Sequence, residues 1–263
     1  MVTVAAGVDN IEKTTAGKRE HAALLRRADV VEGAIALLDA EGLDGLTTRK
    51  LGASLDVRGP ALYRHFPSKE ALLDAMADRL LESVVAPVPD GPWDEQLMFL
   101  ARRLRAALLA HRDGARVVAG TYVAGPNTRL LEDALFRILE AAGFPAEQAG
   151  WVTLTCGHYV LGHTIEEQAQ ARLSATGAWT ERKHDLVRGR AESEYARTAL
   201  TSAFDADPGE RFEFGVGLLL DGLRRRLLDS TAPPPAADAR TADAPAPARD
   251  GAPGACDDGG DGT

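Results

Sequence analysis

Apolar residues recur along this chain at the three- and four-residue spacing that places them on one face of a helix. The first such stripe begins after Arg26, and Gly42 supplies a residue at which a helix ends. Further stripes predict helices over 68–86, 93–111, 130–142, 146–171, 191–204 and 210–229. Residues 172–190 are polar and irregular. No segment alternates apolar and polar residues as a strand does, so the pattern predicts an all-α fold.

Two short helices and a tight turn are predicted between residues 47 and 67. Thr47 is a suitable N-cap for the first helix, whose Leu51 and Leu55 lie four residues apart on one face. The second begins near Pro60 and ends before Pro67, because a proline can start a helix but cannot continue one. At about two turns this second helix is too short to be stable alone, so it must pack against its neighbours.

The second short helix carries different groups on its two faces. Leu62 and Phe66 form an apolar face that packs inward, and Ser68 can cap the longer helix that follows. The outer face consists of Ala61, Tyr63, Arg64 and His65. Small, basic and aromatic side chains on an exposed helix suit the major groove of DNA, where a guanidinium can bond guanine and small groups allow close approach.

The charge distribution supports a DNA-binding interpretation. The whole chain has a formal net charge of −9, yet residues 45–69 contain five basic side chains against Asp56 alone, which gives a local net charge of +4. Phosphate contacts provide much of the affinity of proteins for nucleic acids, so a basic segment in an acidic protein marks where DNA would bind. The overall acidity argues against a general nucleic-acid coat protein or a membrane-surface binder.

Composition limits the remaining possibilities. An apolar content of 45% over 263 residues supports a sizeable core. Cys156 and Cys256 are too few for a disulfide framework or a zinc cluster, which predicts a reducing compartment. The chain has no uncharged apolar window of about 18 residues and no hydrophobic signal-peptide core, so we expect a cytoplasmic protein without a membrane partner.

The ends of the chain differ in composition from its middle. Residues 1–23 are polar and predict a flexible arm, which is either a disordered leader or a contact to the minor groove of DNA. Residues 231–263 are rich in proline, alanine, glycine and aspartate and predict a disordered acidic tail. Between them we expect a small domain at 24–70 and a larger one at 71–230.

The last predicted helix indicates a homodimer. Residues 210–229 are too apolar and too glycine-rich for the exposed end of a monomer. Burial against a second copy would explain this composition, and a two-fold dimer would place two reading helices about one turn of the duplex apart. Burial within one chain is the alternative.

Few residues are candidates for catalysis or metal binding. His158 and His163 diverge by about 140° around a helix, so only His163 shares a face with Glu166 or Glu167. Two ligands do not complete a metal site, and the glycine pair at 215–217 lacks the third glycine of a dinucleotide loop. We therefore predict no enzyme activity, no metal and no cofactor. A helical enzyme that uses His163 and Glu166 is the weaker alternative.

The stretch LTTRKLGASLDVRGPALYRHFPSKEALLDAM, residues 46–76, resembles the tetracycline-repressor (TetR) family of bacterial regulators. The similarity continues more loosely to about residue 229. It implies an all-helical homodimer whose N-terminal helix-turn-helix domain binds a palindromic operator and whose larger domain binds an inducer that releases the DNA. An activator of the same fold, or a regulator that answers to a protein, is the alternative.

The resemblance also implies roles for individual residues. Thr48, Arg49, Tyr63 and Lys69 match positions that contact the operator, mainly its phosphates, and the reading helix spans 59–65. Together with the charge pattern, this predicts the following DNA contacts: Thr48, Arg49, Arg58, Gly59, Pro60, Ala61, Tyr63, Arg64, His65 and Lys69. Because Gly59, Ala61 and Arg64 differ from the residues of tetracycline repressors, the operator sequence does not carry over. The helices at 146–171 and 208–229 would form the four-helix bundle of the dimer.

The expected inducer site departs from that of the tetracycline-binding members. Val85, Leu100, Leu135 and Val118 stand where those members have the polar and magnesium-coordinating side chains, and only Glu166 of the metal-linked set remains. An aliphatic side chain cannot coordinate a metal, and buried polar groups without partners are costly, so we do not expect magnesium–tetracycline to be the inducer. We predict a more apolar pocket. Its lining would be Val85, Leu100, Leu104, Val118, Leu135 and Trp151, with Thr121, His158, His163 and Glu166 as polar contacts.

Overall fold

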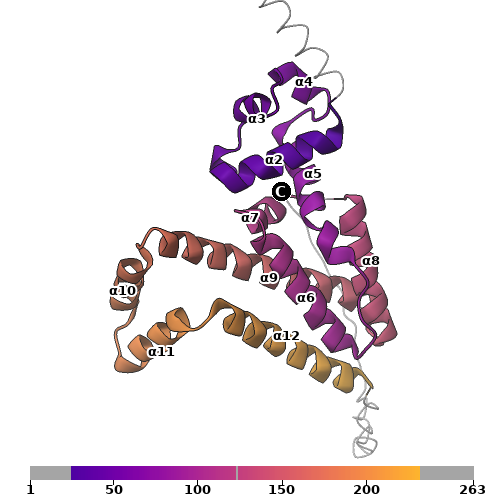
Figure 1. Cartoon of the computed structure of the whole chain (residues 1–263). Coiled ribbons are helices and arrows are strands. Elements are labelled where there is room, and N and C mark those ends of the chain that lie inside the picture. Colours follow the sequence, from indigo (N-terminus) through magenta and orange to yellow (C-terminus); the bar gives the residue numbers. More distant parts are fainter. Residues whose placement is uncertain (1–24, 123, 232–263) are drawn as a thin grey trace, which may run out of the picture.

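Every regular element of the described chain is a helix (Figure 1), which confirms the all-α prediction. The computed structural model describes residues 25–122 and 124–231, so the predicted arm at 1–23 and the tail beyond 231 lie outside it. The N-terminal elements are α2 (Arg27–Glu41), η1 (Leu43–Gly45), α3 (Thr48–Ser54), α4 (Gly59–Tyr63) and α5 (Lys69–Leu80). The remaining elements are η2 (Glu82–Val85), α6 (Trp93–Leu109), α7 (Gly114–Ala119), α8 (Pro126–Ala141), α9 (Ala146–Ala175), α10 (Trp179–Arg190), α11 (Glu194–Asp205) and α12 (Pro208–Thr231).

The helices form two packed units joined by α5. In Figure 1, α2, α3 and α4 lie at one end of the molecule, and α5 leads from them to the larger unit of α6, α8, α9 and α12. The helices α10 and α11 project to one side of the larger unit. Each unit has its own apolar core, and the core of the N-terminal unit includes most of the buried side chains of α5. Therefore α5 packs as part of the unit that carries α4.

The helix caps and the inward-facing residues of the N-terminal unit lie as predicted. The hydroxyl of Thr47 accepts a bond from the Lys50 N–H at 3.2 Å, and Ser68 accepts one from the Ala71 N–H at the same distance. Leu62 is buried as expected, and so is Phe66 just beyond the end of α4. These contacts hold the five-residue α4 in place, since a helix of this length has little stability of its own.

Two predictions about the helices are wrong. The segment 172–190 is mostly helical, because α9 continues to Ala175 and α10 follows. The apolar pattern there is sparse because α10 packs mainly on α11, through an edge-on contact of Trp179 with Phe204 at 5.9 Å between ring centroids. The helix expected to begin at residue 130 begins at Pro126 instead. Asn127 and Thr128 lie within its first turn.

Paired arginines of α6 fix the larger unit. The guanidinium of Arg105 donates to the carboxylate of Glu167 on α9 at 2.8 Å, and that of Arg102 donates to Glu213 on α12 at 2.7 Å. The Arg105 pair is largely shielded from solvent and is the stronger constraint, whereas exposed pairs contribute about 1 kcal/mol or less. The middle helix α6 is thereby held between its two neighbours, α9 and α12.

A buried carboxylate joins the two units. Asp113 has a left-handed backbone (φ 57°), and its side chain accepts bonds from the Leu43 N–H at 3.0 Å and from Arg172 at 2.7 Å. Burial opposes the ionisation of this carboxyl, but the Leu43 bond and the charges of Arg172 and Arg116 outweigh it and lower the pKa of Asp113. The ionised form is therefore the one that stabilises the fold at neutral pH.

Asp113→Asn should lower the free energy of unfolding at pH 7 by about 1–3 kcal/mol, because it removes the charge of a buried carboxylate whose arginine partners are partly exposed to solvent. The folded-state pKa lies below the value of about 3.9 for an unfolded aspartate, so the stabilisation is present above that pH and is lost as the pH falls through the folded pKa. Urea unfolding at several pH values between 7 and about 2 measures this, with the exposed Asp133→Asn on α8 as control. An equal loss of stability at every pH value contradicts the assigned role.

Candidate nucleic-acid interface and ligand cavity

The exposed side of α3 and α4 carries most of the predicted DNA contacts. Arg49, Arg58, Arg64 and Lys69 are exposed, as are Pro60 and the ring of Tyr63, while Gly59 and His65 are partly exposed. Thr48, Tyr63 and Lys69 come together around one small depression of this surface. The three residues come from α3, α4 and α5, so the packing of the whole N-terminal unit sets their positions.

Ala61 does not face outward. Only 8% of its surface is exposed, and it lies in the core of the N-terminal unit with Val57 and Leu62. The prediction that it faces DNA is wrong because a five-residue helix has few inward positions and uses a small residue to approach its neighbours closely. The outer surface of α4 is therefore narrower and carries mainly Tyr63 and Arg64.

Two contacts that the sequence pattern did not reveal adjust this surface. Lys50 donates to Glu41 at 2.5 Å, so one of the five basic charges of residues 45–69 is offset within the protein. Arg27 donates to the carbonyl oxygen of His65 at 2.7 Å and lies 4.0 Å from the centre of the Phe66 ring. This arginine of α2 fixes the C-terminal end of α4 and so the direction in which the short helix points.

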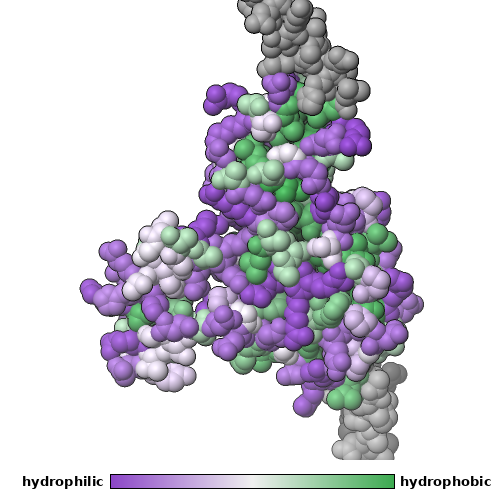
Figure 2. All heavy atoms as spheres, viewed as in Figure 1, coloured by the Kyte–Doolittle hydropathy of each residue, from purple (hydrophilic) through white to green (hydrophobic). Residues whose placement is uncertain are grey.

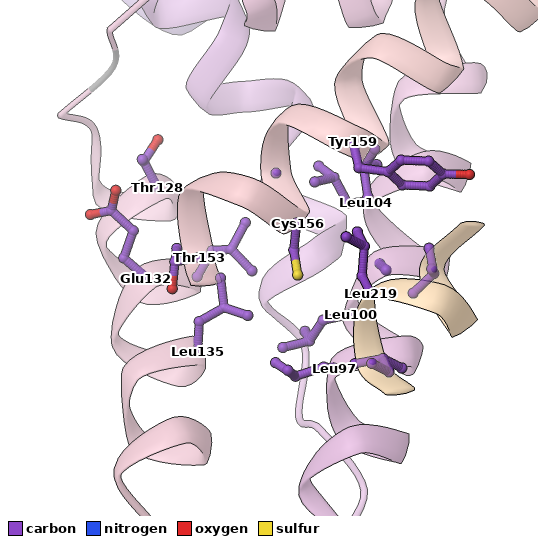
Figure 3. Close-up of a pocket in the computed structure, with 16 residues that line it drawn as sticks. Leu97, Leu100, Leu104, Thr128, Glu132, Leu135, Thr153, Cys156, Tyr159 and Leu219 are labelled. Carbon is purple, nitrogen blue, oxygen red and sulfur yellow. The ribbon is translucent and has the colours of Figure 1, made fainter. Parts of the chain in front are cut away.

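A separate cavity lies between α6, α8, α9 and α12 in the larger unit (Figure 3). It has a volume of about 160 Å³ and is lined mainly by leucine and valine side chains. The cavity brings together Leu100, Leu104 and Leu135, three of the residues predicted to line a pocket. Apolar walls of this kind favour the apolar surface of a small molecule.

A few polar groups face this cavity, and the sequence did not single them out. The Thr153 hydroxyl is buried and has no hydrogen-bond partner among the described residues. The thiol of Cys156 points into the cavity in Figure 3, and burial raises the pKa of Cys156, so the thiol stays protonated and is a weak nucleophile. Glu132 directs its carboxylate away from Cys156. These features arise from packing between distant segments, which a linear pattern does not encode.

Three residues predicted for the pocket lie outside the cavity. Val85 lines a different groove, formed by residues 85–88 and α8. Val118 packs between the two apolar cores, and the Thr121 hydroxyl donates to the Val118 carbonyl oxygen at 2.9 Å. The predicted grouping of these three with Leu100 is therefore wrong.

Four more predicted residues lie on other faces of α9. Trp151 is 61% exposed, and His158 and Glu166 are exposed as well. His163 directs Nε2 toward the carbonyl oxygen of Pro208 at 2.9 Å, so it contacts the start of α12 and does not line the cavity. Burial outweighs this bond and lowers the pKa of His163, which keeps the ring neutral at pH 7. A 30-residue helix meets different neighbours along its length, so shared helical spacing did not identify one pocket.

Among the described residues, no three histidine, cysteine, aspartate or glutamate side chains gather closely enough to hold a metal ion. Within the same ranges, none of the helices has the length and apolar character needed to cross a membrane.

Comparison with protein families matches both units. Residues 30–76 match the profile described as bacterial regulatory proteins of the tetR family, and residues 86–227 match that of the tetracyclin repressor-like C-terminal domain. The chain belongs to the tetracycline-repressor family. The resemblance carried by residues 46–76 is thereby confirmed, and the matched family is one of regulatory proteins.

Solved structures similar to this TetR-family protein include one in complex with operator DNA and one in complex with a small molecule. It is 40% identical over 202 residues to the class A tetracycline repressor from transposon 1721 of Escherichia coli, a match that covers 76% of this chain and 90% of the relative. The structure of BioQ of Mycobacterium smegmatis with its double-stranded DNA operator has a TM-score of 0.57, 32% identity and coverage of 76% and 99%. That of ActR of Streptomyces coelicolor with actinorhodin has a TM-score of 0.67, 28% identity and coverage of 77% and 98%.

Proposed function

We propose that this protein is a transcriptional repressor that binds a palindromic operator as a homodimer and is released by a small, largely apolar inducer. The observation that carries the proposal is the pairing of an exposed basic surface on α3 and α4 with a separate apolar cavity in the larger unit. BioQ with its operator and ActR with actinorhodin support the two binding activities. The repressor acts in the cytoplasm, where bacterial DNA lies.

The homodimer is supported by the outer faces of α9 and α12. Trp151 and Leu154 on α9 and Phe214 and Leu218 on α12 are large apolar side chains that are exposed in the single chain. Trp151 and Leu218 line the same groove between the two helices. In the view of Figure 2 most of the surface is hydrophilic and apolar side chains form only local patches, so large exposed apolar residues on α9 and α12 stand out. A second copy that covers the α9–α12 face removes this apolar surface from water.

The inducer is an apolar molecule with few polar groups. Leucine and valine side chains form most of the cavity wall, and the unpaired Thr153 hydroxyl offers one point for a hydrogen bond. A ligand that bonds this hydroxyl gains more than a purely apolar one, because a buried polar group without a partner costs about 1–3 kcal/mol. Tetracycline with magnesium has too many polar groups for this wall.

Binding to a palindromic duplex selected from a random DNA library tests the proposed function. Arg49→Ala and Lys69→Ala should each weaken binding to all duplexes alike and make the slope of log affinity against log salt shallower by about two, because the dimer carries each substitution twice. Arg64→Ala should lower affinity for the selected duplex by about 1–3 kcal/mol per half-site and relax the preference at one base position of each half-site. Fluorescence anisotropy at several salt concentrations measures both effects. If Arg64→Ala lowered the affinity for every duplex equally, Arg64 would contact only phosphates.

A further inference from the structure

A buried aspartate of α5 caps α8 from outside that helix. Asp78 is 9% exposed, and its carboxylate accepts bonds from the N–H of Thr128 at 3.0 Å and from its hydroxyl at 3.1 Å. The Asn127 amide donates to the backbone carbonyl oxygen of Asp78 at 3.0 Å. The N-cap of α8, Gly125, has no side chain to satisfy the first N–H groups, so Asp78 performs this function. We name this set of contacts between Asp78 and residues 127–128 the α5–α8 clamp.

The clamp requires a close approach of the two segments. A Cβ atom at Gly125 would lie 2.1 Å from the carboxylate of Asp78, so no larger residue fits there unless the Asp78 side chain leaves its position. The negative charge of Asp78 also meets the positive end of the α8 dipole, which adds a favourable interaction. The position of α5 is thereby tied to the first turn of α8.

The two sides of the clamp belong to the two proposed binding sites. On one side, Leu72 and Met76 of α5 lie in the core that holds α4, so α5 carries the reading helix with it. On the other side, Thr128 and Leu131 of α8 line the ligand cavity. Thr128 contacts Asp78 and the cavity at once, so a shift of this turn of α8 changes both.

A second set of contacts holds the N-terminal unit at a different point. Asp39 at the end of α2 accepts a bond from the Arg112 N–H at 2.9 Å and lies 3.0 Å from Nδ1 of His111. Arg112 also donates to the carbonyl oxygen of Ala40 at 2.9 Å. The N-terminal unit is thus attached at the turn between α6 and α7, through Val117 of α7 in its core, and at the α5–α8 clamp.

We propose that Asp78 is a positioning residue that couples occupancy of the cavity to the orientation of α4. A molecule in the cavity displaces the first turn of α8, and the clamp carries this displacement into α5 and the reading helix. This proposal rests on the proposed function. The α5–α8 clamp connects the ligand cavity to α4, so loss of the clamp should uncouple DNA binding from occupancy of the cavity.

Filling the cavity by substitution tests the coupling without an inducer. Cys156→Phe places a ring where the thiol points into the cavity, and it should weaken binding to the selected palindromic duplex about tenfold. In the Asp78→Ala background, the same Cys156→Phe change should alter affinity by less than twofold. Asp74→Ala, an exposed change one turn earlier on α5, is the control and should leave the tenfold effect intact.

The comparison of Cys156→Phe in the wild-type and Asp78→Ala backgrounds separates coupling through Asp78 from a purely structural role of Asp78. If Asp78 only stabilises the fold, Asp78→Ala lowers the melting temperature and Cys156→Phe has the same effect in both backgrounds, which overturns the proposal. An unchanged affinity for Cys156→Phe alone also overturns it, because a filled cavity then moves nothing. If Asp78→Ala does not fold, Asn127→Ala with Thr128→Val weakens the clamp from the α8 side and serves in its place. Failure of the wild-type protein to bind any palindromic duplex refutes the proposed function instead.

Discussion

Leu218→Glu should convert the homodimer into a monomer and weaken operator binding at least about 100-fold. Leu218 is 57% exposed in the single chain and lies in the groove it shares with Trp151 on the α9–α12 face. In a two-fold interface each substitution occurs twice, and each new carboxylate replaces a leucine that would pack against the second copy, so two charges lose their hydration. A monomer contacts only one half-site and forgoes the gain from simultaneous binding of the second.

Sedimentation velocity and operator anisotropy measure the two consequences of this substitution. The matched control is Leu130→Glu, a leucine of α8 with 54% exposure that lies outside the α9–α12 face. The control should remain dimeric and bind the operator as the wild type does. A dimeric Leu218→Glu variant with wild-type affinity would show that the second copy uses another face.

Magnesium–tetracycline should leave the operator complex intact, although the chain is 40% identical to a tetracycline repressor. Leu100 and Leu135 present only aliphatic groups to the cavity, and the described residues provide no cluster of metal ligands. Polar groups of the drug would lose their hydrogen bonds to water without replacement, which costs several kcal/mol. An apolar inducer at 100 times its dissociation constant should instead stabilise the protein by about 2.7 kcal/mol.

A thermal-shift assay followed by a gel shift with operator measures this difference. A stabilisation of about 2.7 kcal/mol corresponds to a rise of about 5 to 10 °C in the melting temperature of a chain of this size. The class A tetracycline repressor in the same buffer, with tetracycline and magnesium, serves as the positive control. Release of the operator from this protein by micromolar tetracycline with magnesium would contradict the assignment of an apolar cavity.

Local sequence signals were sufficient for the N-terminal unit. The caps Thr47 and Ser68 and the inward residues Leu62 and Phe66 depend on neighbours within a few positions, and the structure confirms all four. Ala61 was misplaced because a small residue at the surface of a short helix fits inward or outward positions equally well by pattern alone. Its burial depends on the packing of α3 and α4 together.

The cavity and the clamp depend on contacts that are distant in the sequence. Thr153 and Cys156 are ordinary residues in a long apolar helix until α6, α8 and α12 surround them. Asp78 lies 50 positions from Thr128, so the spacing that identifies a normal N-cap was absent. The sequence therefore predicted the kind of pocket and three of its residues, Leu100, Leu104 and Leu135, but not its polar groups or its connection to α5.

The most direct test of a ligand-controlled DNA-binding dimer is one titration. The selected palindromic duplex, labelled for fluorescence anisotropy, is saturated with wild-type protein, and an apolar compound identified by thermal shift is then added. We predict one dimer per duplex, an affinity that falls steeply with salt, and release of the DNA as the compound saturates the cavity. A compound that occupies the cavity while the dimer holds the duplex with unchanged affinity would contradict the central claim.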